Sequence, residues 1–298
     1  MKNNINRKIP EGIRYISKGT REFPSRLLEL SDCPEGIYVK GSLPDPKKKT
    51  VAIVGARMCT PYGRATASCF ARVLAAHDVQ IISGLALGVD GAAHEGALLA
   101  GGTTFAVLAC GVDICYPRSN IGLYEQMKDT GGILSEEPPG CPPLARLFPK
   151  RNRIISALSD LVLVVEARHK SGSLITADFA MEQGRDIFAV PGRLEDELSR
   201  GCNELIEQGA GIALSPERLL ESMGKICEES DNLKKTKENV LAREENMVYS
   251  CLRLQPKSLE ELCRETGYSV TAVMESVMLL QLRGLVKEIG RNRYSKVQ

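Results

Sequence analysis

The segment Val51-Ala52-Ile53-Val54-Gly55-Ala56-Arg57 joins four apolar residues to a glycine-containing turn. Six more short apolar runs follow it, and successive runs start about 24 to 30 residues apart. They cover residues 79–82, 104–108, 133–134, 161–165, 187–190 and 211–214. This spacing predicts strands joined by returning helices, because parallel strands need a crossover connection. Since the runs are apolar throughout, we expect an α/β fold with a doubly wound, mostly parallel sheet covered on both faces.

The segments between the apolar runs carry helix signals. Thr60 and Pro61 suit an N-cap and the first helical position. Residues 92–100 are rich in alanine and leucine and stop at two glycines, and residues 173–183 stop at Gly184. We therefore expect one α/β domain over residues 45–222.

Three smaller segments flank that domain. Residues 1–44 contain too little apolar material for a core of their own, so they are predicted to form a short N-terminal extension. Residues 223–246 are dense in both charge signs, which is typical of a solvated linker. Residues 247–298 show three helical patterns and a glycine-turned hairpin, and Ser258 and Glu261 fit a capping box. These elements predict a small C-terminal winged-helix domain.

Composition narrows the class of protein. The 298 residues include 39 Lys and Arg against 37 Asp and Glu, so a polyanionic partner would have to bind at local patches. No apolar run is long enough to span a membrane, and residues 1–6 lack the apolar stretch of a secretory signal. The ten cysteines are scattered without a CxxC pair, which favours free thiols over a metal site. We expect a soluble, cytoplasmic protein with no membrane partner.

Small residues follow almost every predicted strand. Glycine and serine let backbone N–H groups approach a ligand, and helix N-termini add partial positive charge. The positions are Gly55, Ser83, Gly84, Gly111, Ser171, Gly172, Ser173 and Gly192. Because parallel strands end at one edge of the sheet, these loops predict a row of phosphate-sized seats for a nucleic-acid chain. The alternative is that each glycine only serves a tight turn.

The run from Phe148 to Ser156 places Lys150, Arg151 and Arg153 within four residues, with Asn152 between them. Lysine and arginine neutralise phosphates, and a ring such as Phe148 stacks on an unpaired base. A solvated helix face is the alternative interpretation of this run. Arg57 is a further candidate, for which the alternative is a structural ion pair.

No catalytic or metal-binding constellation is evident. The histidines are His77, His94 and His169, and none stands in a Ser-His-Asp or metal-ligand spacing. Asp90 and His94 lie four residues apart, which favours a capping or pairing role over acid–base work. Neither GxGxxG nor GxxxxGK[ST] occurs, so a standard dinucleotide or P-loop site is disfavoured. We expect no cofactor, no metal and no enzymatic activity.

A larger set of motifs resembles one family. The motifs are Val-Ala-Ile-Val-Gly-Ala-Arg (51–57), Ser-Gly-Leu-Ala-Leu-Gly-Val-Asp (83–90), Cys-Gly-Val-Asp (110–113), Phe-Pro-Lys-Arg-Asn-Arg-Ile-Ile-Ser (148–156), Ser-Gly-Ser-Leu-Ile-Thr-Ala (171–177) and Ala-Val-Pro-Gly (189–192). In this order, over about 170 residues, they resemble the DNA-processing protein A family, also called DprA or Smf.

The resemblance implies an extended Rossmann-like domain that binds single-stranded DNA. It also implies a homodimer that protects incoming strands during natural transformation and loads the RecA recombinase onto them. By matching motif, it assigns DNA contact to Arg57, Ser83, Gly84, Phe148, Lys150, Arg151, Asn152, Ser171, Gly172 and Ser173. Two features depart from the family: residues 1–44 are too short for an N-terminal helical domain, and Ala56 replaces a residue that often carries a hydroxyl.

The predicted winged helix and the alternatives complete the picture. Residues 270–281 contain Glu275 and no Lys or Arg, which favours a protein contact, while Arg291 and Arg293 keep duplex binding open. One alternative is a phosphoribohydrolase-like or other protein that binds nucleotide-derived ligands, although Pro191-Gly192-Arg193 lacks the Pro-Gly-Gly loop that those enzymes resemble. A transcription regulator that reads duplex DNA is a further alternative.

Overall fold

The computed structural model describes residues 9–225, 243–252, 256–282, 284–290 and 292–297. These residues form two compact units that divide after Lys225. We call residues 9–225 the N-terminal unit and the described residues from 243 onward the C-terminal unit. Most of the predicted charged linker, 223–246, lies outside the described residues.

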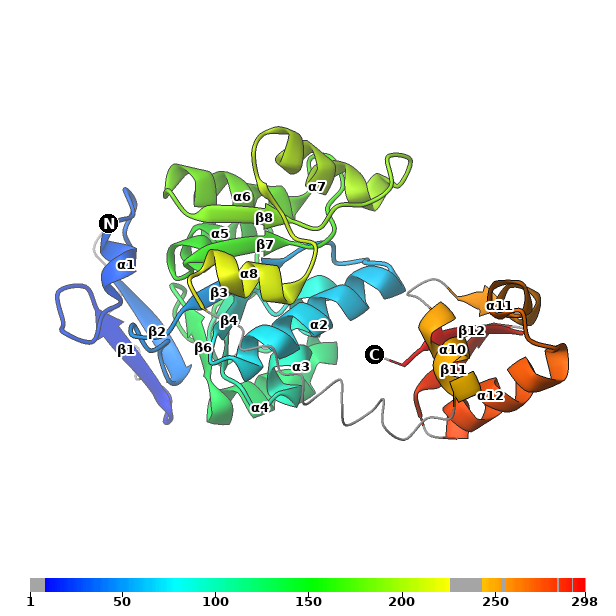
Figure 1. The fold of residues 1–298 in the computed structure, drawn as a ribbon. Helices are drawn as coiled ribbons and strands as arrows, with labels where there is room; N and C mark the ends of the chain where they lie inside the picture. The colour runs from blue at the N-terminus through cyan, green and yellow to red at the C-terminus, as the bar shows by residue number, and fades with distance from the viewer. Residues whose placement is uncertain (1–8, 226–242, 253–255, 283, 291, 298) are drawn as a thin grey trace. The chain divides into compact units, whose positions relative to one another are not determined.

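The N-terminal unit is built around a nine-stranded sheet of order β1-β2-β6-β5-β4-β3-β7-β8-β9 (Figure 1). The strands are β1 (Ile13–Ser17), β2 (Gly36–Gly41), β3 (Thr50–Val54), β4 (Gln80–Ser83), β5 (Thr104–Leu108), β6 (Gly132–Ser135), β7 (Leu161–Val164), β8 (Asp186–Ala189) and β9 (Gly211–Ile212). Strands β3 to β9 pair in parallel. All seven apolar runs are strands, and the mostly parallel α/β sheet is confirmed.

Helices follow the strands, as the apolar spacing predicts. They are α1 (Ser25–Leu28), α2 (Pro61–Ala76), α3 (Val89–Leu99), α4 (Ile121–Thr130), α5 (Leu147–Ala157), α6 (Gly172–Glu182), α7 (Glu197–Glu207) and α8 (Pro216–Ser222), with a 3-10 turn η1 (Arg118–Asn120). The hydroxyl of Thr60 caps α2 by accepting the Gly63 N–H, and Pro61 is the first residue of that helix. The cap and proline predicted there are confirmed.

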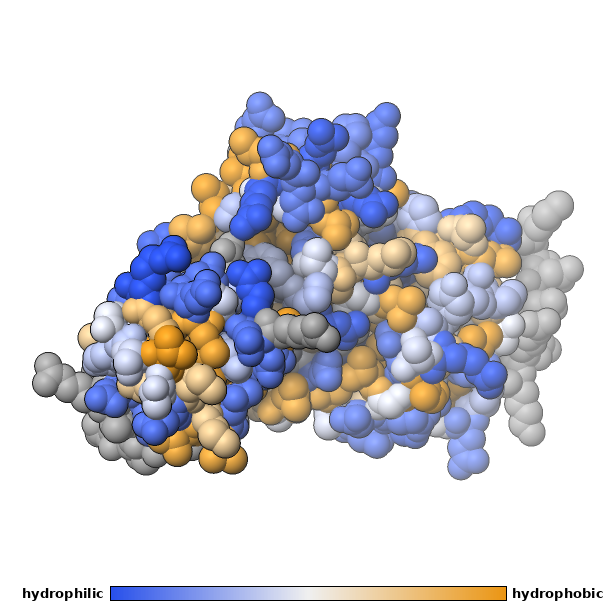
Figure 2. Space-filling view, turned by 90° about the vertical axis from the view of Figure 1, so that its right-hand side faces the viewer, coloured by the Kyte–Doolittle hydropathy of each residue, from blue (hydrophilic) through white to orange (hydrophobic). Residues whose placement is uncertain are grey.

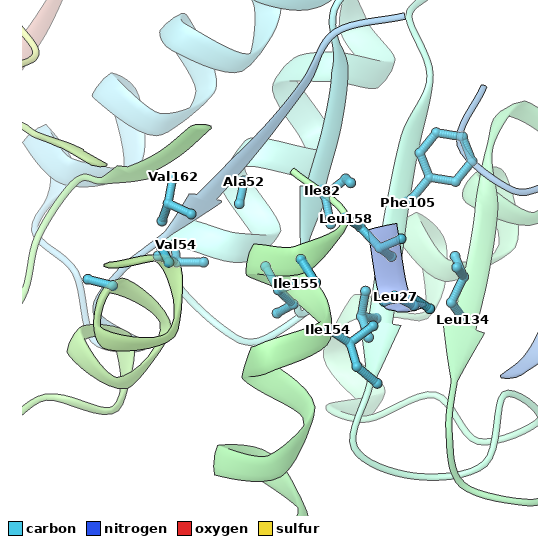
Figure 3. Packing of buried hydrophobic residues seen from close by; sticks show 14 of the residues in the cluster. Leu27, Ala52, Val54, Ile82, Phe105, Leu134, Ile154, Ile155, Leu158 and Val162 are labelled. Carbon is cyan, nitrogen blue, oxygen red and sulfur yellow. The ribbon is translucent and has the colours of Figure 1, made fainter. Parts of the chain in front are cut away.

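Alternate side chains of β5 show that helices cover both faces of the sheet. Phe105 and Val107 pack in a core with residues of α5 and α6, whereas Ala106 and Leu108 pack with Tyr124 of α4 on the other face. Figure 3 shows Ile154 and Ile155 of α5 pointing toward the strand residues of the first core. Both faces are therefore apolar, which explains why β5 is buried at every position.

Residues 13–41 extend the main sheet. Strand β2 pairs antiparallel with β6, and β1 pairs antiparallel with β2. Leu27 of α1 lies fully buried near Ile154 and Leu134 in the α5-side core (Figure 3). The segment therefore shares the core of the α/β unit, in agreement with its small apolar content.

The order of the strands reverses at one place in the sheet. From β3 the chain builds β4, β5 and β6 in one direction, then returns to β7 beside β3 and continues to β8 and β9. In open α/β sheets, ligands bind outside the carboxyl ends of the strands at such a reversal. The loops after β3 and β7 are therefore the positions where a site is expected.

The C-terminal unit has its own core and its own sheet. Its elements are α10 (Arg243–Cys251), β10 (Lys257–Ser258), α11 (Leu259–Thr266), α12 (Val270–Leu282), β11 (Val286–Gly290) and β12 (Arg293–Lys296), and its antiparallel sheet has the order β10-β12-β11. The core contains Val248, Leu252, Leu262, Val273, Val277, Leu280 and Val286. The predicted capping box is present, since Ser258 and Glu261 exchange side chain–backbone hydrogen bonds at the start of α11.

Candidate nucleic-acid interface

A pocket of about 300 Å³ opens where the strand order reverses. Its walls are Gly55 and Arg57 after β3, the first turn of α5, and the start of α6. The backbone N–H of Ala56 donates to the Glu166 carbonyl over 2.7 Å, so the end of β7 fixes the loop after β3. The site thus lies at the carboxyl edge of the sheet, where the topology places it.

Arg57 and Phe148 form the mouth of this pocket. The Arg57 side chain is exposed, and its Cζ lies 4.9 Å from the centroid of the Phe148 ring. Tyr116 meets the other side of that ring edge-on, with centroids 5.8 Å apart. No described carboxylate forms an ion pair with Arg57, so the structural ion pair considered for it does not occur among the described residues. A cation over an aromatic ring offers an anion and a base face at one place.

Arg151 forms the floor of the pocket rather than its rim. Its guanidinium is 6% exposed and donates to the carbonyls of Gly84 (3.0 Å) and Val107. Burial lowers the pKa of Arg151 to about 10, and nearby Arg57 lowers it further while Asp90 opposes the change. The group still carries its charge at neutral pH. Arg151 therefore supplies a fixed positive charge behind the exposed guanidinium of Arg57.

Gly84 is glycine because Arg151 occupies the space beside it. A Cβ at Gly84 would stand 2.6 Å from the Arg151 guanidinium. The Gly84 N–H donates to Asp90 Oδ2 over 3.1 Å, which confirms the capping or pairing role predicted for that carboxylate. Burial raises the pKa of Asp90, against the influence of Arg151. The loop after β4 thus holds the pocket floor.

The start of α6 supplies the opposite wall. Ser171 is the N-cap and its hydroxyl accepts the Ser173 N–H over 3.4 Å. Asn152 of α5 donates to the Gly172 carbonyl over 3.1 Å, which joins the two helices. A Cβ at Gly172 would meet nothing within 4 Å, so packing does not require this glycine. A helix N-terminus at this position favours a negatively charged ligand.

The three cations of α5 separate into three environments. Lys150 is half exposed, does not line the pocket, and pairs with Glu136 at 3.1 Å and Glu137 at 3.8 Å. Arg153 is buried and pairs with Asp32 at 2.6 Å and Glu136 at 2.8 Å. Because each helical residue turns by about 100°, neighbours in sequence point in different directions. Arg151 is the α5 cation that reaches the pocket.

Three other predicted positions serve the framework of the unit. Ser83 is buried and donates to the Ile53 carbonyl over 2.6 Å. Gly111 and Gly192 do not line the pocket, and a Cβ at either would meet another atom within 2.4 Å. Of the fourteen predicted residues, the pocket is lined by Gly55, Arg57, Phe148, Arg151, Asn152, Ser171, Gly172 and Ser173.

Sequence reasoning missed part of the lining. Asp90 was considered, but for pairing alone, while Ile155, Ile175 and Thr176 were not singled out as site residues. Ile155 and Thr176 point inward from α5 and α6 one turn after the predicted residues. Their helical spacing from Arg151 and Gly172 is the signal that could have identified them.

A second hollow of about 290 Å³ adjoins the first. The two share Arg57 and Ser171, and the second is also lined by Arg168, His169 and Lys170. Arg168 lies 3.8 Å from Glu197, and His169 Nδ1 lies 3.0 Å from Glu204. Arg57 thus stands between two hollows that both contain cationic side chains.

Other site classes find no support in the described part of the chain. It contains no group of three or more His, Cys, Asp or Glu side chains placed to hold a metal ion. All nine of its cysteines are free thiols. None of its helices is long and apolar enough to cross a membrane.

Comparison with known proteins agrees with this geometry. Residues 14–224 match the family described as DNA recombination-mediator protein A. The chain belongs to that family. It is 45% identical to protein Smf of Escherichia coli strain K12 over 202 residues, and 42% identical to the DNA processing protein DprA of Streptococcus pneumoniae over 216 residues. The matches cover 67% and 69% of this chain, and 54% and 76% of the two relatives.

Two solved structures resemble the chain. The X-ray structure of DprA from S. pneumoniae is 41% identical, with a TM-score of 0.68, and the alignment covers 71% of this chain and 74% of that one. DNA processing protein A from Helicobacter pylori is 32% identical, with a TM-score of 0.63 and coverage of 71% and 95%. That structure is described as showing a single-stranded DNA binding mode of the H. pylori protein. The expected family and the Rossmann-like fold are confirmed.

Proposed function

We propose that this chain binds single-stranded DNA, without enzymatic activity, through the pocket at the β3–β7 reversal. The observation that carries the proposal is the Arg57 guanidinium over the Phe148 ring, exposed and without a described carboxylate partner, in front of the buried charge of Arg151. A phosphate meets Arg57, Arg151 and the start of α6, while an unpaired base stacks at Phe148. Such contacts carry little sequence information, so binding is largely independent of sequence.

The neighbouring hollow supports a path for more than one nucleotide. Arg57 and Ser171 belong to both hollows, and Arg168 and Lys170 add cations beyond them. Duplex DNA keeps its bases stacked inside the helix, so Phe148 has no base face to meet. We therefore expect a preference for the single strand that weakens as salt rises.

The cellular role that we propose follows the family. The chain protects incoming strands during natural transformation in the cytoplasm and loads RecA recombinase onto them as a homodimer. Membership of a family of DNA recombination mediators supports this role. The three helices and antiparallel sheet of the C-terminal unit support a winged-helix domain. In that unit Arg293 pairs with Glu261 at 3.2 Å, and Arg291 lies outside the described residues.

Fluorescence anisotropy tests the proposal directly. Labelled oligo-dT and a duplex of the same length are titrated with the full chain at two salt concentrations. The expected result is tighter binding of oligo-dT, with an affinity that falls as salt rises. Equal or tighter duplex binding would contradict the proposal and favour a duplex-reading regulator. Release of ribose phosphate from nucleotides, measured in parallel, would favour the phosphoribohydrolase-like alternative.

A second assay separates binding from mediation. RecA filament formation is followed on single-stranded DNA that is first covered with single-strand binding protein. We expect this chain to shorten the lag before RecA assembles. Tight binding of oligo-dT with an unchanged lag would retain the DNA site and remove RecA loading from the proposed function.

A further inference from the structure

Helix α12 of the C-terminal unit presents a stripe of apolar side chains to solvent. Val270, Met274, Met278 and Leu282 are exposed by 56, 53, 65 and 78%. They lie four residues apart, so they share one side of the helix, and Leu279, exposed by 43%, widens that side. Figure 2 shows apolar residues that reach the surface in patches between hydrophilic ones. Contiguous exposed apolar surface marks interaction sites.

Folding of the C-terminal unit does not require this stripe. The core of the unit is supplied from the other side of α12, by Val273, Val277 and Leu280, all of which are buried. A helix on the surface of a globular unit normally carries polar residues opposite its buried face. The stripe therefore needs an explanation outside the packing of a single copy.

The charges on α12 exclude nucleic acid as its partner. Glu275 is the one charged residue among positions 270–282, and this stretch contains no Lys or Arg. Nucleic-acid binding depends on cations that neutralise phosphates. The stripe is suited instead to another apolar protein surface.

The positions of the stripe are symmetric about Ser276. Val270 and Leu282 lie six residues on either side of it, and Met274 and Met278 lie two residues on either side. Two antiparallel copies of α12 that cross near Ser276 would place each apolar side chain against an apolar side chain of the other copy. A two-fold interface requires this reciprocity, in which residue i meets residue j and j meets i.

We propose that the α12 stripes of two copies of this chain pair antiparallel and join the molecules through their C-terminal units. Five large apolar side chains per copy, each more than 40% exposed, supply an interface on the order of 1,000 Å² in total. That area lies at the lower end for specific association, so the contact is reversible in the micromolar range. It is separate from the DNA pocket and does not depend on the proposed function.

Sedimentation velocity of the full chain over a range of concentrations tests this contact. For the unmodified chain we expect a reversible association step that raises the weight-average mass. Met278→Glu and Met274→Lys each place a charge in the apolar contact and should weaken that step by at least about tenfold. Leu194→Glu is the matched control, because Leu194 is an exposed apolar residue of the N-terminal unit, at 84%, and its change should leave the step intact.

Mixing the two variants tests the antiparallel geometry. In a mixed pair the introduced lysine lies opposite the introduced glutamate, and Met278 of one copy lies opposite Met274 of the other. An equimolar mixture should therefore recover the association that each variant alone has lost. Recovery would support the proposal, whereas a mixture that associates as weakly as the separate variants would overturn it.

Three further results would overturn the proposal. They are a concentration-independent mass for the unmodified chain, an unchanged association step in Met278→Glu, and a photo-crosslink from p-benzoylphenylalanine at position 278 to a peptide of the N-terminal unit. A crosslink to the α12 peptide of a second copy would support it. Circular dichroism and oligo-dT binding at low nanomolar protein verify that each variant is folded and keep this test separate from that of the DNA site.

Discussion

Arg57 in the loop after β3 and Arg153 in α5 have the same side chain but different surroundings. Arg57 is exposed, lies over an aromatic ring and has no described carboxylate partner. Arg153 is 2% exposed and is held between Asp32 and Glu136. An exposed guanidinium is available to a phosphate, whereas a buried ion pair is part of the framework. Position in the fold, not residue type, separates binding from stability here.

The largest expected effect is on stability, at the buried arginine. Arg153→Ala leaves the Glu136 carboxylate without its partner and should lower the free energy of unfolding by about 2–3 kcal/mol. Urea denaturation followed by circular dichroism measures this. Arg14→Ala is the control, since Arg14 forms an exposed ion pair with Glu22 at 2.6 Å and should change stability little. Equal effects of the two substitutions would contradict the distinction between buried and exposed arginines.

The next effect is on DNA binding, at the exposed arginine. Arg57→Ala should weaken oligo-dT binding by about 10- to 100-fold, because a charge-assisted contact of roughly 1.5–3 kcal/mol is lost. The slope of log affinity against log salt should fall by about 0.7 for one phosphate contact. The control is Arg218→Ala, at an exposed arginine of α8. A variant that binds normally but unfolds more easily would reverse the roles assigned to Arg57 and Arg153.

A pH titration sharpens the comparison at the pocket floor. His94 is buried, its Nδ1 lies 2.7 Å from the Thr104 hydroxyl, and burial followed by the charge of Arg151 lowers its pKa to about 3. The unfolded chain binds a proton at His94 below about pH 6.5 and the folded chain does not. The free energy of unfolding should therefore fall as pH drops from about 6.5 toward 3, by up to ~1.4 kcal/mol per pH unit from this group.

His94→Gln should make that decline shallower, and His169→Gln, at an exposed histidine, should not. Chemical denaturation at half-unit pH steps gives the two slopes. If the unmodified chain and His94→Gln lose stability in parallel between pH 6 and 4, then His94 does not stay neutral in the folded protein.

The smallest effect is expected at Lys150, which is intermediate between the two arginines. Its ammonium is half exposed but pairs with Glu136 and Glu137 outside the pocket. Lys150→Ala should lower oligo-dT affinity by about twofold and stability by less than about 0.5 kcal/mol. A loss of affinity as large as that of Arg57→Ala would extend the DNA path over the outer face of α5.

The sequence alone predicts the strands and the edge where ligands bind. Every apolar run became a strand, because burial on both faces of a parallel sheet requires continuous apolar residues. The loops after β3 and β7 were predicted as phosphate seats, because small residues and helix starts are visible in the sequence. The same local signals indicated Arg57 and Phe148. These features depend on neighbours a few residues away.

Only the tertiary structure decided which cations face the pocket. Lys150, Arg151 and Arg153 lie within one turn of α5, and the sequence does not show which of the three directions is the pocket. Their partners come from distant segments: Asp32 reaches Arg153 from the N-terminal segment, and Gly84 accepts from Arg151 after β4. Helical patterning fixes the spacing of charged residues, but burial depends on what the fold packs against them, and that is decided by contacts far apart in the chain.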